Sequence, residues 1–324
     1  MPQNETLLFI LFNLFILALL LLDLGVFHRK DKAVSLKEAA GWSVVWITLS
    51  LIFNVGLFFW VQDNTGSTQE ATRIGLEFLA GYLIEKALSV DNIFVFILIF
   101  SYFGVPAKFQ HRVLFWGVLG ALVMRGIFIA AGATLIAEFE WILYIFGAVL
   151  IYSGWKMMKD EEIEVHPDKN IVIRYAKKLF PVETGYETHN FFIKRGGRRY
   201  ITTLFLVLLT VETTDVVFAV DSIPAVFGVT RDPFIVYSSN VFAILGLRAL
   251  YFLLAGVMNA MYYLKHGLSI ILIFIGVKML AETAGMIHVP IGVSLAVIGV
   301  VLFVSVVISL NRNKRLAKGS LNNE

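Results

Sequence analysis

Long apolar runs separated by short charged segments constrain this chain more than any other feature. Runs of about 20 apolar residues are long enough to cross the hydrocarbon core of a bilayer as helices. Only 16% of the 324 residues are charged and 58% are hydrophobic, whereas soluble domains have about 25% charged residues. We therefore expect an all-α, polytopic membrane helix bundle with about nine transmembrane helices, at residues 5–27, 38–60, 73–103, 112–133, 141–158, 200–228, 234–257, 266–283 and 289–310.

The distribution of Lys and Arg predicts the orientation of these spans. If the N-terminus is outside, the outer loops contain only Arg73 and Arg231. The basic residues that would then be inside are Arg29, Lys30, Lys32, Lys37, Lys108, Arg112, those of 159–199, Lys265, Arg312, Lys314, Arg315 and Lys318. An excess of Lys and Arg marks the cytoplasmic side. The first apolar run lacks a basic start and an Ala-x-Ala cleavage site, so we expect it to be retained as a helix.

Several function classes are disfavoured by what the chain lacks. With no cysteine, a disulfide framework, a thiolate metal site and a cysteine nucleophile are excluded. We find no phosphate-binding loop, no Ser/His/Asp arrangement and no His/Glu zinc spacing. We therefore expect no enzyme activity, no catalytic or cofactor-binding residues and no nucleic-acid partner.

Residues 159–199 form the largest predicted soluble segment. "DKNIVIRYAKKLF" has apolar residues and lysines at helical spacing, which suits an amphipathic helix on the inner membrane surface. "FFIKRGGRRYIT" centres on Gly196 and Gly197, which suggests a hairpin turn. A solvated connector is the alternative for both stretches.

An internal repeat connects two parts of the chain. "EKALSVDNIF" (85–94) resembles "DVVFAVDSIP" (215–224), "GALVMRG" (120–126) resembles "AILGLRA" (243–249), and "LIYSGWKMM" (150–158) resembles "LIFIGVKML" (272–280). Each copy would cross the membrane three times, so the second copy enters from the opposite side. Such inverted repeats are common in secondary transporters, whose substrate sites lie between the halves.

The repeat divides the chain into five predicted parts. Residues 1–72 would form two peripheral transmembrane helices, 73–158 the first repeat and 159–199 a cytoplasmic loop. The second repeat would follow at 200–283, and 284–324 would form the last transmembrane helix and a basic cytoplasmic tail.

Acidic residues inside the apolar runs are the candidate functional site. An ionised group in hydrocarbon costs at least a few kcal/mol unless something compensates it. Carboxylate, amide and hydroxyl oxygens together suit Mn²⁺, Mg²⁺ or Ca²⁺. The predicted metal ligands are Glu85, Asp91, Asn92, Glu212, Asp215, Asp221 and Ser222.

A purely structural neutralisation of these acids is the alternative interpretation. The cations available for it are Lys86, Arg125 and Arg248. Structural pairing is our preferred role for the two arginines, and pairing or snorkelling for Lys86. Asp23, near the inner end of the first span, is equally consistent with an inner vestibule and with an interfacial acid. Asn54 and Asn240 suit interhelical hydrogen bonds as well as they suit metal binding.

Helical geometry limits how these acids can cooperate. On a regular helix, Glu85, Ser89 and Asn92 share a stripe, whereas Asp91 lies about 120° from Glu85. Asp221 lies equally far from Asp215, so one ion could bind both acids of a copy only if the helix unwound locally. Pro224 and the short polar residues of the first copy favour such a break. We therefore expect unwound segments at 88–93 and 218–223.

At these residues the chain resembles the TerC family of integral membrane proteins, especially its Alx-type members. The resemblance covers most of residues 20–285 and is strongest in "FLAGYLIEKALSVDNIFVF" and "VVFAVDSIPAVFGVTRDPFIVYSSNVFAILGLRALYFLL". It implies a bacterial inner-membrane protein of the LysE-like transporter superfamily. The family was first named for tellurium resistance, and several members are linked to manganese export. Its intramembrane acidic motifs match Glu85 and Asp91, and Asp215 and Asp221.

The leading expectation is therefore a divalent metal-ion exporter with Mn²⁺ as the preferred substrate. Crowded carboxylates also bind protons more readily, so proton exchange is a further hypothesis. The alternative is a non-transporting membrane scaffold for metal or tellurite stress, with structural charges and a partner-binding 159–199 loop. Composition alone does not choose among Mn²⁺, Ca²⁺ and Mg²⁺, and it leaves the oligomeric state open.

Overall fold

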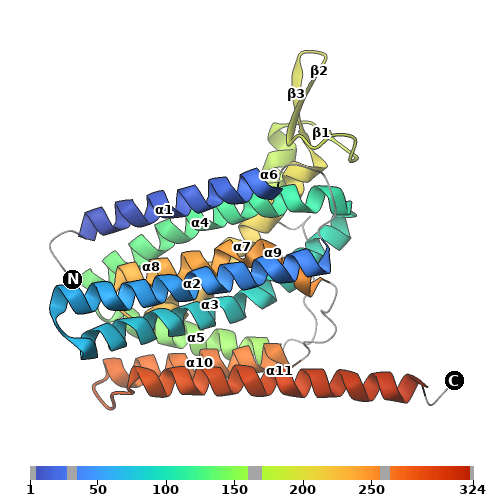
Figure 1. Cartoon of the computed structure of the whole chain (residues 1–324). Helices are drawn as coiled ribbons and strands as arrows, with labels where there is room; N and C mark the ends of the chain where they lie inside the picture. Colours follow the sequence, from blue (N-terminus) through green and yellow to red (C-terminus); the bar gives the residue numbers. More distant parts are fainter. Residues whose placement is uncertain (1–4, 28–34, 160–169, 256–262, 322–324) are drawn as a thin grey trace.

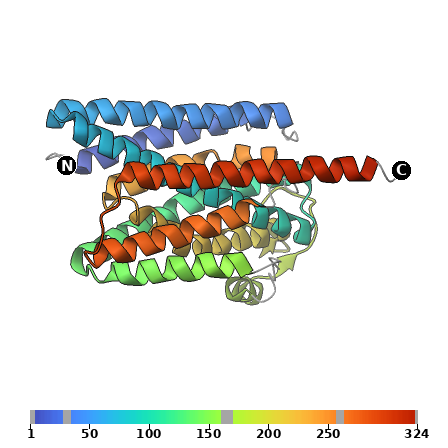
Figure 2. The same cartoon turned by 90° about the horizontal axis from the view of Figure 1, so that it is seen from below.

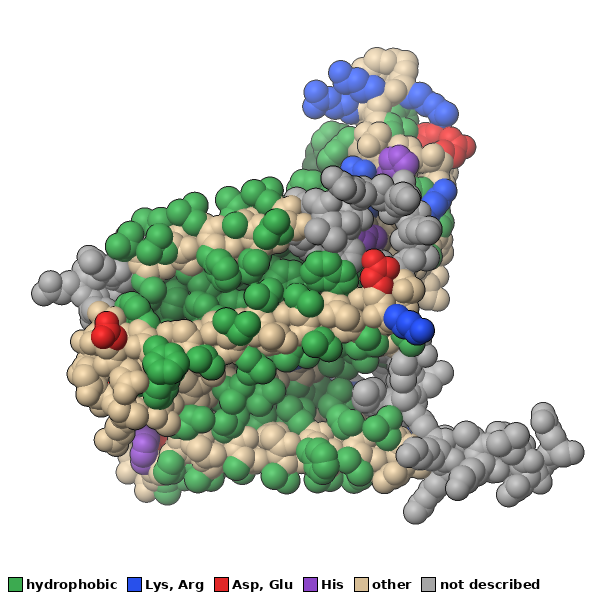
Figure 3. Space-filling view, viewed as in Figure 1, with side chains coloured by type: hydrophobic (Ala, Val, Ile, Leu, Met, Phe, Trp, Pro, Cys, Tyr) green, Lys and Arg blue, Asp and Glu red, His purple; other side chains and the backbone are tan. Residues whose placement is uncertain are grey.

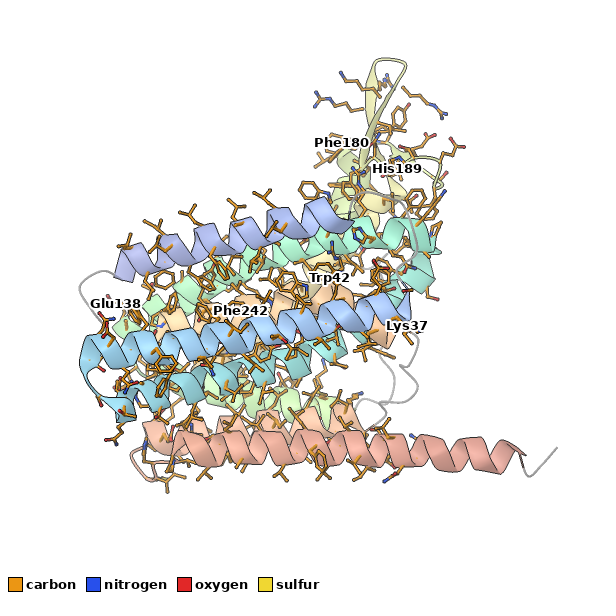
Figure 4. All side chains as sticks on the ribbon, viewed as in Figure 1. Lys37, Trp42, Glu138, Phe180, His189 and Phe242 are labelled. Carbon is orange, nitrogen blue, oxygen red and sulfur yellow. The ribbon has the colours of Figure 1, made fainter. Side chains whose placement is uncertain are left out.

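The computed structural model describes residues 5–27, 35–159, 170–255 and 263–321, with side chains for 7–22, 35–159, 170–255 and 263–312. Long helices lie side by side with their axes roughly parallel, and a small helix–sheet cap projects sideways at one end of the bundle (Figure 1). We call that end of the bundle the cap end, and the opposite end the far end. Lys37 lies toward the cap end and Glu138 lies at the far end (Figure 4).

The helices of the bundle follow the predicted spans closely. They are α1 (Glu5–Phe27), α2 (Leu36–Thr65), α3 (Thr68–Phe103), α4 (Ala107–Glu138), α5 (Ile142–Lys159), α7 (Thr203–Phe227), α8 (Pro233–Leu245), α9 (Leu247–Leu254), α10 (Leu264–Thr283) and α11 (Ile291–Leu321). Within the described residues, five helices are long and apolar enough to cross a membrane. A sixth span is obtained if α8 and α9, which meet at a bend of 42°, are one broken span. The all-α membrane bundle is confirmed, and the number nine stays a prediction.

Local sequence signals set several helix ends. Ser35 and Ser67 cap α2 and α3 by accepting hydrogen bonds from backbone N–H groups three residues on. Gly66 and Gly104 end the same two helices with φ of 66° and 62°, a conformation that glycine adopts without strain. Asp232 caps α8, whose first residue is Pro233.

The centre of the bundle is formed by the two predicted repeats. α3 packs on α7 and α8, α4 packs on α7 and α8, and α5 packs along α10. α1, α2 and α11 lie at the periphery (Figure 2), and much of their apolar surface is exposed. The face seen in Figure 3 is largely apolar over the bundle, with basic side chains gathered on the cap. This distribution is the one expected of a bundle surrounded by lipid.

The cap consists of α6 (Ile171–Leu179) and a three-stranded sheet of β1 (Val182–Glu183), β2 (Phe192–Arg195) and β3 (Arg198–Thr202). The strand order is β1–β3–β2, with β1 parallel and β2 antiparallel to β3. Gly196 and Gly197, with φ of 55° and 79°, form the turn of the predicted hairpin. The predicted helix and hairpin are confirmed, and the position of the helix on the inner membrane surface stays a prediction. The small sheet is an addition to the all-α prediction.

The expected unwound segments at 88–93 and 218–223 are wrong. α3 and α7 are helical through both segments, including the residues around Pro224. In a buried apolar environment an unwound backbone would leave N–H and C=O groups without water or partners, and this outweighs the weak local preference of Ser and Asn. The break of the central helices lies instead at Gly246, between α8 and α9.

Candidate functional site

Arg125 of α4 is the centre of a buried polar network. Its side chain contacts a carboxylate from each predicted repeat: Nη1 donates to Glu85 Oε1, and Nη2 donates to Asp215 Oδ1 at 3.1 Å. Nη1 also lies 3.3 Å from Ser222 Oγ and 3.2 Å from Asn240 Oδ1. Arg125, Glu85 and Asp215 are 1%, 0% and 4% exposed. Arg125 thus forms ion pairs with an acid of each predicted repeat.

The network holds more negative than positive charge. One guanidinium faces two carboxylates, and Asn240 adds a neutral amide that donates to Glu85 Oε2 at 3.0 Å. Glu212, one helical turn before Asp215, is half-buried, and its carboxylate lies against Gly120 of α4. The centre of the bundle therefore favours binding of a further cation or proton.

A stripe of polar side chains leads from Glu85 toward the cap end. Ser89 and Asn92 are buried on the face of α3 that carries Glu85. Ser89 Oγ and Asn92 Nδ2 have no hydrogen-bond partner within the described part of the chain. Buried polar atoms are normally paired. Ser89 Oγ is therefore available to water or to a passing cation, whereas Asn92 Nδ2, a donor, is available to water.

Apolar side chains close the stripe on its cap-end side. Phe96, the next residue on the stripe, borders a cavity of about 10 Å³ together with Leu114, Val211, Asp215 and Leu247. That volume is about the minimum that holds one water molecule. A hydrated ion would need these side chains to separate before it could reach Asp215 from the cap end.

Asp91 and Asp221 lie apart from the central network and from each other. Tyr186 of the cap donates to the carbonyl of Phe103, so the last turn of α3 is at the cap end, where α7 begins. The two helices are therefore antiparallel. Asp91 lies about 9 Å from Glu85 toward the cap end, and Asp221 lies about 9 Å from Asp215 toward the far end. Both carboxylates are only partly buried.

Asp221 has a partner that the sequence did not suggest. Ser153 Oγ of α5 donates to Asp221 Oδ1 at 2.5 Å. Ser153 precedes Gly154 in the repeated stretch "LIYSGWKMM", whereas the matching position of the second copy is Ile275. The sequence signal that could have identified Ser153 is its hydroxyl, because the matching residue of the second copy is apolar.

The other two predicted cations have different surroundings. Within the described residues, Lys86 is bonded to a backbone group and not to an acid: its Nζ donates to the carbonyl of Ala243 at 3.2 Å. A regular helix would pair that carbonyl with the N–H of Leu247, so Lys86 occupies an acceptor at the α8–α9 break. Arg248 is buried at the start of α9, and its pairing with an acid stays a prediction. The side chain of Asp23 lies outside the described residues.

The predicted ligands do not converge on one point. Within the described residues, no group of three or more His, Cys, Asp or Glu side chains is arranged to hold a metal ion. The acids form three levels along the bundle axis instead: Asp91, the Glu85–Asp215 pair at Arg125, and Asp221. This arrangement suits a path for a cation better than a permanent metal centre.

Comparison with known proteins agrees with the membrane bundle. The model of the TerC family of integral membrane proteins matches residues 70–317. An uncharacterized membrane protein of Myxococcus xanthus is 46% identical over 303 residues, which cover 94% of this chain and 92% of the relative. A Salmonella typhi protein, provisionally named the membrane-bound redox modulator Alx, is 47% identical over 94% of this chain and 95% of its own length.

The Escherichia coli K12 protein with the same provisional name is 49% identical over 288 residues, 89% of each chain. No solved structure matches the chain. The family model covers most of the bundle, including every residue of the Arg125 network, and the relatives align over nearly their whole length. The chain belongs to the TerC family of integral membrane proteins.

Proposed function

We propose that the chain exports divalent metal ions, with Mn²⁺ as the preferred substrate, and has no enzymatic activity. The observation that carries this proposal is the meeting of Glu85 and Asp215 at Arg125. These acids occupy matched positions of the two predicted repeats, and together they exceed the charge of the arginine by one. A divalent cation can replace the guanidinium as their partner, so Arg125 acts as a built-in cation when no ion is bound.

The remaining polar groups support a path through the bundle. An ion entering at the cap end would pass Asn92, meet Asp91, and then pass Ser89, whose Oγ has no partner within the described residues. It would reach Glu85 and Asp215 and leave past Asp221. Steps of about 9 Å separate the three levels of acids. The apolar side chains around Phe96 would block this route until the helices move, as alternating access requires.

Reciprocal packing supports two halves related by a two-fold axis in the membrane plane. α3 packs on α8 as α4 packs on α7. A side chain at Gly147 would meet the Gly276 carbonyl, and a side chain at Gly154 would meet that of Ser269. By the spacing of the repeat, Gly147 corresponds to Ser269 and Gly154 to Gly276, so each contact is the counterpart of the other. Rocking of one half against the other is the motion we propose.

The donor set supports a hard divalent cation as the substrate. Carboxylate, amide and hydroxyl oxygens bind Mn²⁺, Mg²⁺ and Ca²⁺ and disfavour soft metals. Because the chain has no cysteine, thiol–disulfide exchange cannot explain the redox role suggested by the relatives' name. An effect on cellular redox state would follow from the metal that the protein removes. Protons are the proposed exchange partner, since the carboxylates left by the ion can bind them.

We place the protein in a bacterial inner membrane with nine spans, an outer N-terminus and an inner C-terminus. The cap end is then cytoplasmic, which agrees with the basic side chains on the cap. Ions would therefore move from Asp91 toward Asp221. The division into 1–72, 73–158, 159–199, 200–283 and 284–324 belongs to the same proposal.

Mn²⁺ efflux from loaded proteoliposomes tests the proposal. Asp91→Asn and Asp221→Asn keep the size of each side chain and remove its charge, so each should reduce efflux at least tenfold. Glu183→Gln, which loses an exposed ion pair of the cap, is the matched control and should transport like the parent. Efflux that survives in both Asp variants would contradict the path, and absence of Mn²⁺ efflux in the parent would contradict the function.

A membrane scaffold is the second candidate, favoured by the exposed basic hairpin. The function of a scaffold would require the hairpin and would not require the buried acids. Replacing residues 194–199 by a two-residue turn should leave Mn²⁺ efflux intact in an exporter. A scaffold would lose its stress phenotype with the same change and keep it in Asp91→Asn.

A further inference from the structure

The surface of α6 divides into three faces. Ile173 and Ala176 point toward the bundle, where Ile173 is fully buried against Ile201 and Leu206. The next face, about 100° wide, carries exposed apolar side chains: Ile171, Val172, Tyr175 and Leu179. The third face carries exposed basic side chains: Arg174, Lys177 and Lys178. In water the apolar face would be costly, because those four side chains are 44–73% exposed.

The position of α6 explains this apolar face. Asn170, its N-cap, donates to Thr213 Oγ1 of α7 at 2.7 Å, and Ile173 packs against Leu206. α6 thus lies beside the first ten or so residues of α7, within about 15 Å of the start of that helix. At that depth a helix beside a membrane-spanning bundle meets the boundary between lipid headgroups and acyl chains.

The tip of the hairpin places like charges opposite each other. Lys194 faces Arg199, and Arg195 faces Arg198, in adjacent antiparallel pairs. All four side chains are exposed. Like charges at directly opposite positions destabilise a hairpin, and the ion pair of Arg195 with Glu183 compensates one of them. The tip extends sideways beyond the edge of the bundle at the cap end (Figure 1).

We propose that α6 and the hairpin tip form a binding surface for anionic phospholipid in the leaflet at the cap end. The apolar face of α6 inserts between acyl chains, and phosphate groups bind the basic side chains of α6 and the hairpin. Phosphates supply anions to Lys194, Arg198 and Arg199, for which the described part of the chain provides no ion pair. A soluble acidic protein would satisfy these charges but would leave the apolar face of α6, at membrane depth, without a partner.

The orientation of α6 is tested with a fluorescent label. Because the chain has no cysteine, Leu179→Cys and Lys177→Cys each provide a single attachment site for an NBD fluorophore. The two positions lie about 160° apart on the same helix, so each is the control for the other. In nanodiscs of phosphatidylcholine and phosphatidylglycerol, doxyl-labelled lipid should quench the label at 179 at least twice as strongly. Equal quenching at both positions would overturn the proposal.

The lipid charge is tested by titrating dioctanoyl-phosphatidylglycerol into phosphatidylcholine nanodiscs that contain the full chain labelled at 179. Each basic residue near a membrane surface contributes about fivefold in affinity for anionic lipid. The variant with Arg198→Gln and Arg199→Gln should therefore bind about 25-fold more weakly, whereas Arg198→Lys with Arg199→Lys should stay within about twofold of the parent. Unchanged affinity in the Gln variant, or an equal response to dioctanoyl-phosphatidylcholine, would overturn the proposal.

Discussion

Arg125 brings together side chains that are distant in sequence, from α3, α7 and α8. A buried ion network contributes little net stability as a whole, but loss of one member leaves an uncompensated charge in a medium of low dielectric constant. The stability of the buried carboxylates around Arg125 therefore depends on its positive charge more than the number of its contacts suggests. We therefore expect its removal to affect folding and, under the proposed function, ion binding.

Arg125→Gln should lower the free energy of unfolding by about 3–5 kcal/mol, because two buried carboxylates lose their cation. The second change Glu85→Gln should restore part of the loss by removing one of those charges. Thermal unfolding in nanodiscs measures both effects. Arg231→Gln is the matched control, since its pair with Glu140 is exposed and should contribute no more than about 1 kcal/mol. Equal losses for Arg125→Gln and Arg231→Gln would contradict a structural network.

The same variant tests whether Arg125 stands in for the transported ion. With the guanidinium gone, Glu85 and Asp215 should bind Mn²⁺ more readily, so 1 mM Mn²⁺ should raise the Tm of Arg125→Gln more than that of the parent. The triple variant that adds Glu85→Gln and Asp215→Asn should lose this extra rise. If Mn²⁺ shifts the triple variant as much as Arg125→Gln, the ion binds elsewhere.

At the scale of elements, the contact of α5 with α10 is the most extensive between the two predicted repeats. Small residues let the two backbones approach, as is usual between membrane helices. A methyl group on Gly154 would lie 2.7 Å from the Ser269 carbonyl oxygen, and one on Gly276 would lie 2.7 Å from that of Gly147. Side chains cannot be added there unless the helices separate.

Gly154→Ala and Gly276→Ala should therefore each destabilise the protein by about 1–3 kcal/mol, as overpacked cores do. The two losses should be similar, because matched positions of the repeat meet matched surroundings. Gly41→Ala in α2 is the control: nothing lies within 4 Å of the added methyl group, so the change should be neutral or slightly stabilising. Thermal unfolding distinguishes them, and a loss confined to one of the two core glycines would argue against reciprocal packing.

The elements also show what the sequence could predict. Hydropathy, helical spacing and turn residues are local properties. They predicted the helices, the hairpin at Gly196 and Gly197, and the shared face of Glu85, Ser89 and Asn92. They did not predict the break at Gly246, because it depends on tertiary contacts. Lys86 of α3 donates a hydrogen bond to the Ala243 carbonyl, which the break leaves without its helical partner. For the same reason the sequence predicted a break near Pro224 that the packed bundle does not contain.

For the whole molecule, the antiparallel course of α3 and α7 determines which acid faces which side. Charged residues could be recognised from sequence, but their order along the membrane normal required the arrangement of the helices. The acids that were expected to share one ion are instead spread over three levels. Under the proposed function, the direction of transport therefore depends on the orientation of the bundle.

The orientation is tested by cysteine labelling in intact cells. Lys194→Cys at the cap end and Glu140→Cys at the far end place a single thiol on exposed side chains at opposite ends. With more Lys and Arg at the cap end, a membrane-impermeant maleimide should label Glu140→Cys in intact cells, and Lys194→Cys only after permeabilisation. Gly56→Cys, on a lipid-facing stretch of α2, should stay unlabelled in both conditions.

The reverse labelling of Lys194→Cys and Glu140→Cys would make Asp221 the cytoplasmic acid. An exporter would then take up its ion at Ser153 and Asp221 and release it past Ser89, Asn92 and Asp91, so that the apolar closure at Phe96 would lie on the exit side.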